Sequence, residues 1–288
     1  MPELPEVETI VRKLTRGEPV ERGLPAYPSP VGRVITRAWT DWPRAAYPSS
    51  NAIVRKLPNH RIEAIGRRGK YIVFTLSTSS LSTGARLLIH LKMSGRLDVL
   101  QEGTPLDQHV HFVFALDNGY EVRFNDARKF GRVYLVNDPS EITGVLGPEP
   151  LDAAFTLKAF RALMANKSGA LKPLLLDQTF IAGIGNIYAD EALWRARLHP
   201  LRRAGTLSQD EVATLYRGIR AALKDGIRHE GAAIDWVYPE GNYQDHLRVY
   251  GRTGRPCRRC RAAIQRIVVG QRGTHFCPRC QPQRDLRS

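Results

Sequence analysis

The first residues of the chain combine an amine with two carboxylic acids. Met1, Pro2 and Glu3 open the sequence, and Glu6 follows about one helical turn later. Because proline is small, we expect Met1 to be removed, which would leave a secondary amine at Pro2. An α-amine has a reference pKa of about 7.7–8.0, so a useful fraction of it is neutral and nucleophilic near neutral pH. Such an amine suits covalent Schiff-base chemistry, with an acid or base in reach. The alternative is that Pro2 is only a processing signal and the glutamates form a solvated helical turn.

The cysteines have the spacing of a metal site. They form two Cys-x-x-Cys pairs within the last part of the sequence. Four thiolates are a tetrahedral ligand set typical of structural zinc, and such a closed set leaves no open position for catalysis. One structural Zn²⁺ is therefore the predicted cofactor, with four free thiols or two disulfides as the alternatives. The predicted ligands are Cys257, Cys260, Cys277 and Cys280.

Between the cysteine pairs the sequence predicts a hairpin. Ile264–Val269 and Gly273–Phe276 alternate like two short strands, and glycines flank the expected turn. Arg272 lies near the tip, where it could enter a groove or clamp a phosphate. A solvated arginine is the alternative.

A glycine turn runs into the start of a predicted helix at residues 183–186. Gly183 and Gly185 allow positive φ and a close approach to a ligand. Asn186 is a predicted N-cap, and the free amides at such a helix start favour an anion such as a DNA phosphate. Helix capping by itself is the alternative function of Asn186.

Other stretches offer residue types that suit DNA. Lys70 follows two glycines and two arginines and opens a strand, where it meets a phosphate or is simply solvated. Met93, beside a Ser-Gly turn, is either a core residue or a wedge between stacked bases. Arg128 and Phe130 place a cation and an aromatic ring at a strand start; a cross-strand ion pair with a core phenylalanine is the alternative. Two polar loop residues are expected to be solvated: His109 and Lys167.

Composition narrows the class of protein. The chain has 288 residues, of which 42% are hydrophobic, enough for a sizeable core. There is no apolar run of about 18 residues and no apolar N-terminal signal, so we expect a cytoplasmic protein, nucleoid-associated if bacterial.

The charge of the chain is strongly positive. Lys and Arg number 43 against 28 Asp and Glu, a formal net charge of +15. This charge predicts a polyanionic partner, nucleic acid first and an anionic membrane surface second.

The elements that must position these residues follow in order. Residues 5–16 carry the apolar stripe of an amphipathic helix, which would anchor the N-terminal amine. Short β-like runs between about 31 and 136 suggest a sandwich or flattened barrel. The predicted domains are a β-sandwich domain at 1–136, a linker at 137–152, a helical domain at 153–247 and a zinc finger at 248–288.

Taken together, these stretches resemble the formamidopyrimidine-DNA glycosylase (Fpg, MutM) family. The resemblance spans nearly the whole chain in order, and Leu4 separates it from the sister endonuclease VIII-like group, which typically has glycine there. The matching motifs are Pro-Glu-Leu-Pro-Glu-Val-Glu-Thr from Pro2, Gly-Lys-Tyr from Gly69, His-Leu-x-Met-Ser-Gly from His90, Asp-x-Arg-x-Phe-Gly from Asp126, Gly-Pro-Glu-Pro-Leu from Gly147, Gly-Asn-Ile-Tyr-Ala-x-Glu from Gly185, and the four-cysteine finger.

The resemblance implies an α+β, multidomain protein. Its N-terminal helix and β-sandwich would be followed by a helix–two-turns–helix domain and a Cys₄ zinc finger, with DNA in the cleft between them. The implied function is a bifunctional enzyme of base excision repair. It would excise 8-oxoguanine and formamidopyrimidines and nick the abasic strand by β,δ-elimination. The implied partner is double-stranded DNA with oxidised bases or abasic sites, bound by a monomer.

The resemblance also implies roles for individual residues. Pro2 resembles the nucleophile that attacks C1′, and Glu3 the acid and base that opens the sugar. Lys70 matches the lysine assigned to β-elimination, and Arg272 the finger arginine assigned to δ-elimination. Met93, Arg128 and Phe130 resemble the trio that fills the hole left by the flipped nucleotide. The remaining matches are His90, His109, Lys167 and Asn186 as DNA contacts, and Glu6 and Glu191 as supporting acids.

Two departures from the family pattern bear on these expectations. Ala127 and Lys129 replace residues that are often Pro and Arg, with little expected effect. Gly231–Tyr250 matches less clearly, in the region that holds the lesion-covering loop of relatives, so lesion preference is open. One rival is an endonuclease VIII-like enzyme acting on oxidised pyrimidines. The other is a non-catalytic DNA-binding zinc protein, against which the intact Pro-Glu start argues.

Overall fold

The chain folds into two compact units. The computed structural model describes residues 1–19, 26–77, 84–233 and 241–283. The first unit comprises Met1–Val145 and Glu230–Gly241, and the second comprises Leu146–His229 and Asn242–Ser288. The chain therefore returns to the first unit after most of the helical segment, a return that the sequence did not predict. Within the described ranges, no helix is both long and apolar enough to cross a membrane.

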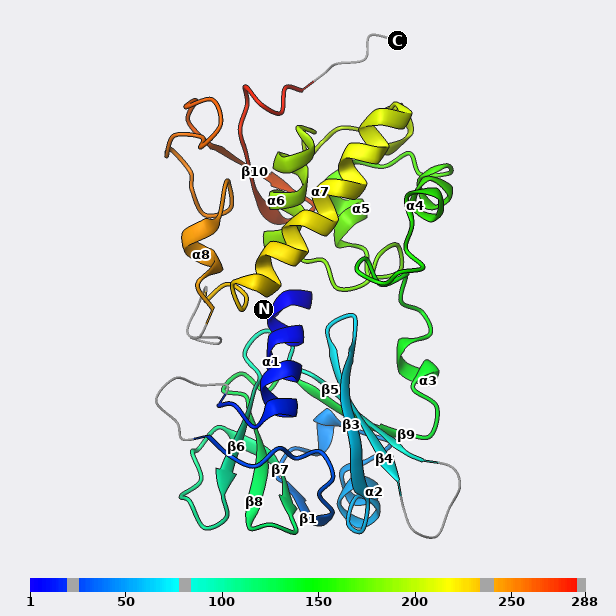
Figure 1. Ribbon diagram of the computed structural model, residues 1–288, viewed down its shortest axis with the longest axis vertical. Coiled ribbons are helices and arrows are strands. Elements are labelled where there is room, and N and C mark those ends of the chain that lie inside the picture. Colours follow the sequence, from blue (N-terminus) through cyan, green and yellow to red (C-terminus); the bar gives the residue numbers. More distant parts are fainter. Residues whose placement is uncertain (20–25, 78–83, 234–240, 284–288) are drawn as a thin grey trace. The chain divides into compact units, whose positions relative to one another are not determined.

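Two β-sheets form most of the first unit (Figure 1). The five-stranded sheet has the order β2-β9-β5-β4-β3, and the four-stranded sheet has the order β1-β7-β8-β6. Neighbouring strands are antiparallel, apart from the parallel pair β2 and β9. The strands are β1 (Ile35–Thr40), β2 (Ala46–Tyr47), β3 (Arg61–Arg68), β4 (Tyr71–Ser77), β5 (Arg86–His90), β6 (Arg96–Gln101), β7 (Val110–Leu116), β8 (Tyr120–Asn125) and β9 (Arg132–Val136). The short helices are η1 (Pro43–Ala45), α2 (Ser50–Lys56) and α3 (Ser140–Thr143).

The core of the first unit lies between the two sheets. Phe74 of β4 meets Phe114 of β7 edge to face, with ring centroids 5.6 Å apart, so the sheets pack face to face. Helix α1 (Leu4–Arg16) adds its apolar stripe, including Val7 and Ile10, to the same core. Because this burial fixes the helix, the residues at its start are held in place. The predicted helix and β-sandwich are confirmed.

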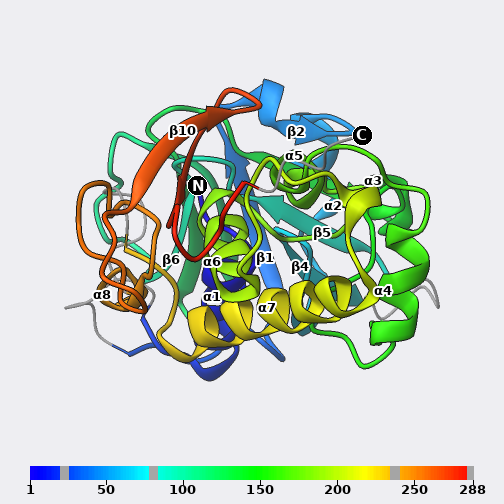
Figure 2. The same cartoon turned by 90° about the horizontal axis from the view of Figure 1, so that it is seen from above.

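The second unit is built on two helices in close contact, α6 and α7 (Figure 2). A Cβ atom at Gly218 of α7 would lie 2.8 Å from the carbonyl oxygen of Ala192 in α6, so only glycine permits this approach. A capping box of Ser208 and Glu211 starts α7. The helices are α4 (Leu157–Met164), α5 (Leu171–Leu176), α6 (Asn186–Ala196), η2 (Ala204–Thr206), α7 (Gln209–Arg228) and α8 (Tyr243–His246).

The predicted hairpin between the cysteine pairs is also confirmed. Strands β10 (Gln265–Val269) and β11 (Arg272–Phe276) are antiparallel. Gly270 and Gln271 join them, with φ of 55° and 62°. Two left-handed residues in a two-residue loop are typical of a type I′ turn, which matches the twist of the strands. Arg272 is exposed and directly follows this turn.

The predicted N-cap of α6 is wrong. Gly185 is the N-cap of α6, with extended backbone, and Asn186 is the first helical residue. The Asn186 amide instead donates to the carbonyl oxygen of Gly273 at 3.1 Å, so its side chain serves a tertiary contact. Strand β6 carries the acidic Asp98 between the buried Leu97 and Val99. In the structure Asp98 is buried and accepts a hydrogen bond from Arg96 at 2.9 Å.

Candidate active site and nucleic-acid interface

The start of helix α1 holds the candidate catalytic end of the chain. Pro2 and Glu3 are buried, whereas Met1 is 44% exposed. The N–H of Glu3 donates to the carboxylate of Glu6 at 2.8 Å, and the two residues form a capping box. Helix capping satisfies backbone groups that would otherwise fray. The structure therefore brings Pro2, Glu3 and Glu6 together on a fixed helix end.

Glu6 also contacts a distant part of the same unit. Its other carboxylate oxygen accepts the N–H of Ala232 at 2.8 Å. A Cβ atom at Gly231, where φ is +84°, would lie 2.8 Å from Cγ of Glu6. A Cβ atom at Gly241 would lie 1.9 Å from the carbonyl oxygen of Gly231. The two ends of the intervening segment thus meet beside Glu6; its residues 234–240, within the predicted lesion-covering region, lie outside the described ranges.

The turn between β3 and β4 presents Lys70 from a buried position. Arg67 joins this turn to α1, because its Nε donates to Glu8 at 3.0 Å and its Nη1 to the carbonyl oxygen of Gly69 at 2.9 Å. Burial alone would raise the pKa of Glu8, but the ion pairs with Arg67 and Arg12 hold that pKa below its ordinary value. Glu8 therefore stays charged, and the Lys70 turn is tied to the helix that carries Glu3.

His90 is the last residue of β5 and is almost fully buried. The N–H of Lys92 donates to its Nδ1 at 2.9 Å, so the neutral ring carries its proton on Nε2. Burial lowers the pKa of His90 to about 3, with the charges of Lys92 and Lys70 acting in the same direction. At neutral pH, His90 is thus a neutral hydrogen-bond donor rather than a cation.

Four predicted DNA contacts lie on three neighbouring turns of the first unit. Met93 is 40% exposed in the turn after β5, and Phe130 is 49% exposed in the turn between β8 and β9. The Arg128 guanidinium lies 5.6 Å from the centre of the Phe130 ring. His109 precedes β7, and its carbonyl oxygen accepts the N–H of Asp126 at 2.8 Å. The exposure of Met93 and Phe130 excludes the alternative that either residue belongs to the core.

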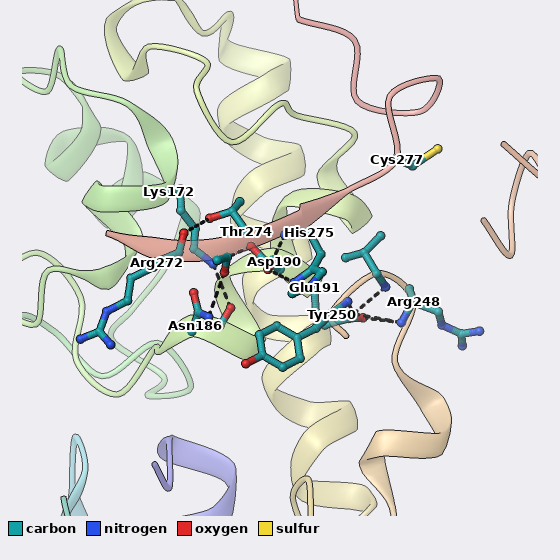
Figure 3. Close-up of polar contacts among 12 residues, drawn as sticks. Lys172, Asn186, Asp190, Glu191, Arg248, Tyr250, Arg272, Thr274, His275 and Cys277 are labelled. Carbon is teal, nitrogen blue, oxygen red and sulfur yellow. Dashed lines mark hydrogen bonds and ion pairs between the residues drawn. The ribbon is translucent and has the colours of Figure 1, made fainter. Parts of the chain in front are cut away.

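In the second unit, the start of α6 lies along strand β11 (Figure 3). The Asn186 amide binds the carbonyl oxygen of Gly273, the residue after Arg272, at 3.1 Å. One turn further along α6, Asp190 accepts the N–H of His275 at 2.9 Å. Two side chains of one helix therefore hold the strand that carries Arg272.

A buried ion pair completes this contact (Figure 3). Lys172 of α5 and Asp190 of α6 are both fully buried, with their charged atoms 2.5 Å apart. Lys172 also donates to the main-chain oxygen of Asn186 at 2.9 Å. Buried ions are costly to desolvate and persist only where further hydrogen bonds satisfy them. Here those bonds join α5, α6 and β11 into one framework.

Glu191, the neighbour of Asp190, holds the segment that leads into the cysteine module. Its carboxylate accepts the N–H groups of Arg248, Val249 and Tyr250 at 2.9–3.1 Å (Figure 3). Burial raises the pKa of Glu191 above its ordinary value, although the three N–H groups favour the charged form.

The predicted DNA contact Lys167 follows helix α4 in the chain, and its ammonium nitrogen lies 5.7 Å from the centre of the Phe180 ring.

The four cysteines converge at the base of the hairpin. All four Sγ atoms lie within 4.8 Å of one another. The Cys260–Cys277 sulfur pair is 3.4 Å apart, and the Cys257–Cys280 pair is 3.9 Å apart. Tetrahedral thiolates about 2.3 Å from one zinc ion lie roughly 3.8 Å apart, so the arrangement fits such an ion. Trp194 donates to Cys257 from its indole N–H at 3.4 Å, the kind of outer contact that supports a metal-bound thiolate.

Comparisons with known sequences cover most of the chain. Residues 1–133 match the formamidopyrimidine-DNA glycosylase N-terminal domain, and residues 146–237 match the formamidopyrimidine-DNA glycosylase H2TH domain. Residues 254–283 match the zinc finger found in FPG and IleRS.

Full-length relatives are similar along the whole sequence. The formamidopyrimidine-DNA glycosylase of Chloroflexus aggregans is 44% identical, over 98% of this chain and 98% of the relative. That of Herpetosiphon aurantiacus is also 44% identical, over 98% of this chain and all of the relative. The chain belongs to the formamidopyrimidine-DNA glycosylase family. It is therefore a member of an enzyme family, as the sequence predicted, and its four-cysteine module is the family's metal-binding finger.

Solved Fpg structures have the same fold. Lactococcus lactis Fpg in complex with DNA containing N7-benzyl-Fapy-dG is 35% identical, with a TM-score of 0.86 over 98% of this chain and 100% of that one. The complex of Lactococcus lactis Fpg with abasic-site DNA gives 34% identity and a TM-score of 0.85, with the same coverage. MutM in complex with DNA containing carbocyclic 8-oxo-G gives 35% and 0.85, again with that coverage.

Several residues of this Fpg-family site were not found from the sequence. In the sequence, Asp126 stands out only as part of a motif, and no local pattern indicates a role for Lys172, Asp190 or Gly231. Asp126 carried a usable signal, because an aspartate directly after a strand often accepts hydrogen bonds from the turn that follows. Lys172 and Asp190 gave none, since a charged residue on a helix is normally solvated.

Proposed function

We propose that the chain is a bifunctional DNA glycosylase and abasic-site lyase of base excision repair. Its substrates would be oxidised purines, 8-oxoguanine and formamidopyrimidines, in double-stranded DNA. The names of its relatives, and the solved complexes of Fpg and MutM with lesion-containing and abasic DNA, support this. One observation carries the proposal: Pro2 sits beside two buried carboxylic acids at the fixed start of α1.

In the proposed reaction, removal of Met1 frees the secondary amine of Pro2. The Pro2 nitrogen attacks C1′ of the extruded nucleotide, the glycosidic bond breaks, and the base leaves with the bonding electrons and takes up a proton. Glu3 then gives a proton to the ring oxygen O4′, so the sugar opens as the nitrogen loses its proton and the iminium forms. The capping box fixes Glu3 next to the amine, which supports this acid role.

The iminium acidifies C2′, so a proton leaves C2′ and the 3′-phosphate departs in β-elimination. A second proton loss then releases the 5′-phosphate in δ-elimination. We assign assistance of the first step to Lys70 and of the second to Arg272. The turn that carries Lys70 is tied to α1 through Arg67, which fixes the position of this buried lysine near the proposed amine, and the exposed Arg272 at the finger hairpin is accessible to a phosphate.

The remaining site residues would bind and deform the DNA. A base within the duplex stack is out of reach of an active site, so the lesion must be turned out at a cost of a few kcal/mol. Met93, Arg128 and Phe130 would offset part of that cost by filling the void. We assign phosphate and backbone contacts to His90, His109, Lys167 and Asn186. We assign supporting roles to Glu6 and Glu191. The net charge of +15 supports a partner of high negative charge.

We further propose that the finger metal is Zn²⁺. Bound by Cys257, Cys260, Cys277 and Cys280, it would crosslink the two ends of the hairpin and leave no coordination position open. The role of the cysteines is therefore to hold the hairpin of Arg272 in one shape.

Trapping with borohydride tests the covalent mechanism. Borohydride reduces an imine, so the mature protein and an 8-oxoguanine duplex should yield a stable protein–DNA adduct. A protein that keeps residues before Pro2 should give no adduct, because an amide nitrogen is not nucleophilic. Pro2→Gly is a poor control, since a glycine amine also forms imines. Absence of any adduct with the mature protein would rule out the covalent mechanism.

A substrate panel tests the lesion class. The panel contains 8-oxoguanine opposite C and opposite A, a formamidopyrimidine, thymine glycol and an abasic site. We expect the fastest excision from the two oxidised purines. Preference for thymine glycol would favour an endonuclease VIII-like activity instead. Binding of all these duplexes without excision or nicking would favour a non-catalytic DNA-binding protein.

A further inference from the structure

One buried carboxylate lies beneath the three turns that carry the predicted DNA contacts. Asp126 follows strand β8 and is fully buried. Its Oδ2 accepts the N–H of Phe130 at 2.9 Å and the N–H of Gly131 at 2.7 Å. Its Oδ1 accepts the hydroxyl of Ser94 and the N–H of Arg128, the latter at 3.3 Å. One side chain thus binds both the turn with Arg128 and Phe130 and the turn with Met93.

The main chain of the same residue holds the third turn. The N–H of Asp126 donates to the carbonyl oxygen of His109 at 2.8 Å, and its carbonyl oxygen accepts the N–H of Lys129 at 3.0 Å. The His109 turn is closed separately by Asp107, whose carboxylate accepts the His109 N–H at 2.8 Å. Asp126 therefore connects segments that are separate in the sequence.

Two glycines show how closely the turns approach each other. A Cβ atom at Gly95 would lie 2.5 Å from the ring of Phe124, and one at Gly131 would lie 2.3 Å from the same ring. The Gly131 position is also 3.1 Å from Oδ2 of Asp126. Both turns thus rest on one aromatic ring, with the Asp126 carboxylate beside it and the side chains of Met93 and Phe130 exposed at their tips.

A side chain that separates stacked bases binds DNA more favourably when it is held rigidly before binding. Separating stacked bases costs a few kcal/mol, and a loop that has to be ordered on binding adds its own entropic cost. Rigid turns avoid this entropic cost, because their exposed side chains are already in position before the DNA binds. The contacts of Asp126 meet this requirement for both turns at once.

We propose that Asp126 is a positioning residue that holds Met93, Arg128 and Phe130 as a single wedge for DNA. Because Asp126 is fully buried, it would touch neither the reacting atoms nor the bases. A carboxylate offers only acceptors, and each partner of its two oxygens is a donor. The inference rests on the proposed function, because it needs a duplex in which a lesion is turned out.

Asp126→Asn is the direct test. The amide of asparagine places an N–H₂ group where one carboxylate oxygen had accepted hydrogen bonds, so at least one turn loses its anchor. We expect excision of 8-oxoguanine paired with C to fall about tenfold or more. Cleavage of a single-stranded abasic oligonucleotide should stay close to wild type, because it has no opposite strand and leaves no void. A 2-aminopurine opposite the lesion should brighten less on binding, since it is less completely unstacked.

Two further variants make the test sharp. Asp98→Asn changes another buried carboxylate of the same unit, which accepts a hydrogen bond from Arg96 on its own strand, and should leave both activities close to wild type. Ser94→Ala removes only the hydroxyl that joins the Met93 turn to Asp126, and it keeps the inference testable if Asp126→Asn fails to fold. We expect the same selective loss on paired lesions, to a smaller degree.

The outcomes separate the inference from the function on which it rests. A wild-type protein without excision or nicking would overturn the proposed function and the inference with it. An active wild type, with Ser94→Ala and Asp126→Asn equal to it on paired lesions, would overturn the inference alone. Equal loss on paired and single-stranded substrates would also overturn it, since that pattern indicates general damage rather than a loose wedge.

Discussion

At the scale of single residues, the charge states of the first unit follow from burial and from a few hydrogen bonds. His90 is the clearest case. Its Nδ1 is occupied by the N–H of Lys92, and burial beside the two lysines keeps the ring neutral. The proposed contact of His90 with DNA is therefore a hydrogen bond from Nε2–H, which requires no proton uptake at neutral pH.

The depressed pKa of His90 predicts a pH dependence of stability. Between its ordinary pKa of about 6.5 and the folded value of about 3, the unfolded chain binds a proton that the native ring does not. The free energy of unfolding should therefore fall as the pH falls through this window, by about 1.4 kcal/mol per pH unit from this residue. In His90→Asn, the asparagine oxygen can still accept the Lys92 N–H, but the side chain no longer binds a proton. The contribution of His90 to the change of the free energy of unfolding with pH should therefore vanish. Urea unfolding at several pH values measures it.

His60→Asn serves as the control for the His90 prediction. His60 is half-buried in the loop before β3, so the change again removes one histidine, but not a fully buried ring. The slope of His60→Asn should remain closer to that of wild type. An identical pH dependence in wild type and His90→Asn would contradict a neutral, buried His90.

At the scale of elements, the start of α1 is built together with a segment from far along the chain. Glu6 caps the helix with one oxygen and binds Ala232 with the other. Gly231 is close to Glu6, and Gly241 is close to Gly231, so these contacts leave no room for a side chain at either glycine. The chain returns to the first unit at this point, and the proposed catalytic end depends on that return.

Gly231→Ala should damage both stability and activity. At φ +84° an alanine is strained by about 1–2 kcal/mol, and its Cβ would also overlap the Glu6 side chain. We expect a further loss of about 1–3 kcal/mol from overpacking, and slower excision because Glu6 and Glu3 are displaced together. Chemical denaturation and the excision rate on 8-oxoguanine duplexes measure these effects.

Gly32→Ala is a closely matched control. Gly32 has φ +83°, but a Cβ atom there meets nothing within 4 Å. Gly32→Ala should therefore lower the free energy of unfolding through backbone strain alone, and its excision rate should be unchanged. Equal losses of stability and activity in the two variants would mean that the contact with Glu6 has no role.

At the scale of the whole molecule, both units carry predicted DNA contacts and the chain has a large positive charge. The second unit fixes its share through α6, where Asn186 and Asp190 bind β11, and Glu191 binds the segment before the finger. Arg272 is thus exposed on a framework that includes a buried ion pair, and the proposed metal would join the four cysteines at the base of the same hairpin. This framework fixes the position of one cation, whereas the net charge attracts DNA without fixing its position on the protein.

Arg272→Ala should weaken DNA binding about equally for all sequences. A phosphate contact releases counterions, so its loss should reduce the slope of log affinity against log salt by about one. Arg217→Ala removes the same charge from an exposed position on α7 and should change the slope less. Titrations of a fluorescent duplex at several salt concentrations measure both variants. Equal slopes for Arg272→Ala and wild type would contradict a phosphate contact.

The sequence by itself determined the features whose partners are near in the chain. The apolar stripe of α1, the capping box of Ser208 and Glu211, and the hairpin between the cysteine pairs all depend on residues a few positions apart. The four-cysteine site was predictable as well, because each Cys-x-x-Cys pair already has the geometry of two metal ligands. Helix and turn periodicity, hydrogen-bonding type and ligand spacing are sufficient for features of this kind.

Only the tertiary structure decided which polar residues meet. Glu6 and Ala232 are 226 residues apart, and Asp190 and His275 are 85 apart. Buried charges such as Asp126 look solvated in a sequence, because nothing local shows that donors from other turns will surround them. Their burial is favourable only once the whole unit is assembled and every oxygen has a donor. The proposed chemistry of Pro2 could thus be expected from its residue type and its neighbours, whereas the surroundings that hold it in place come from the fold.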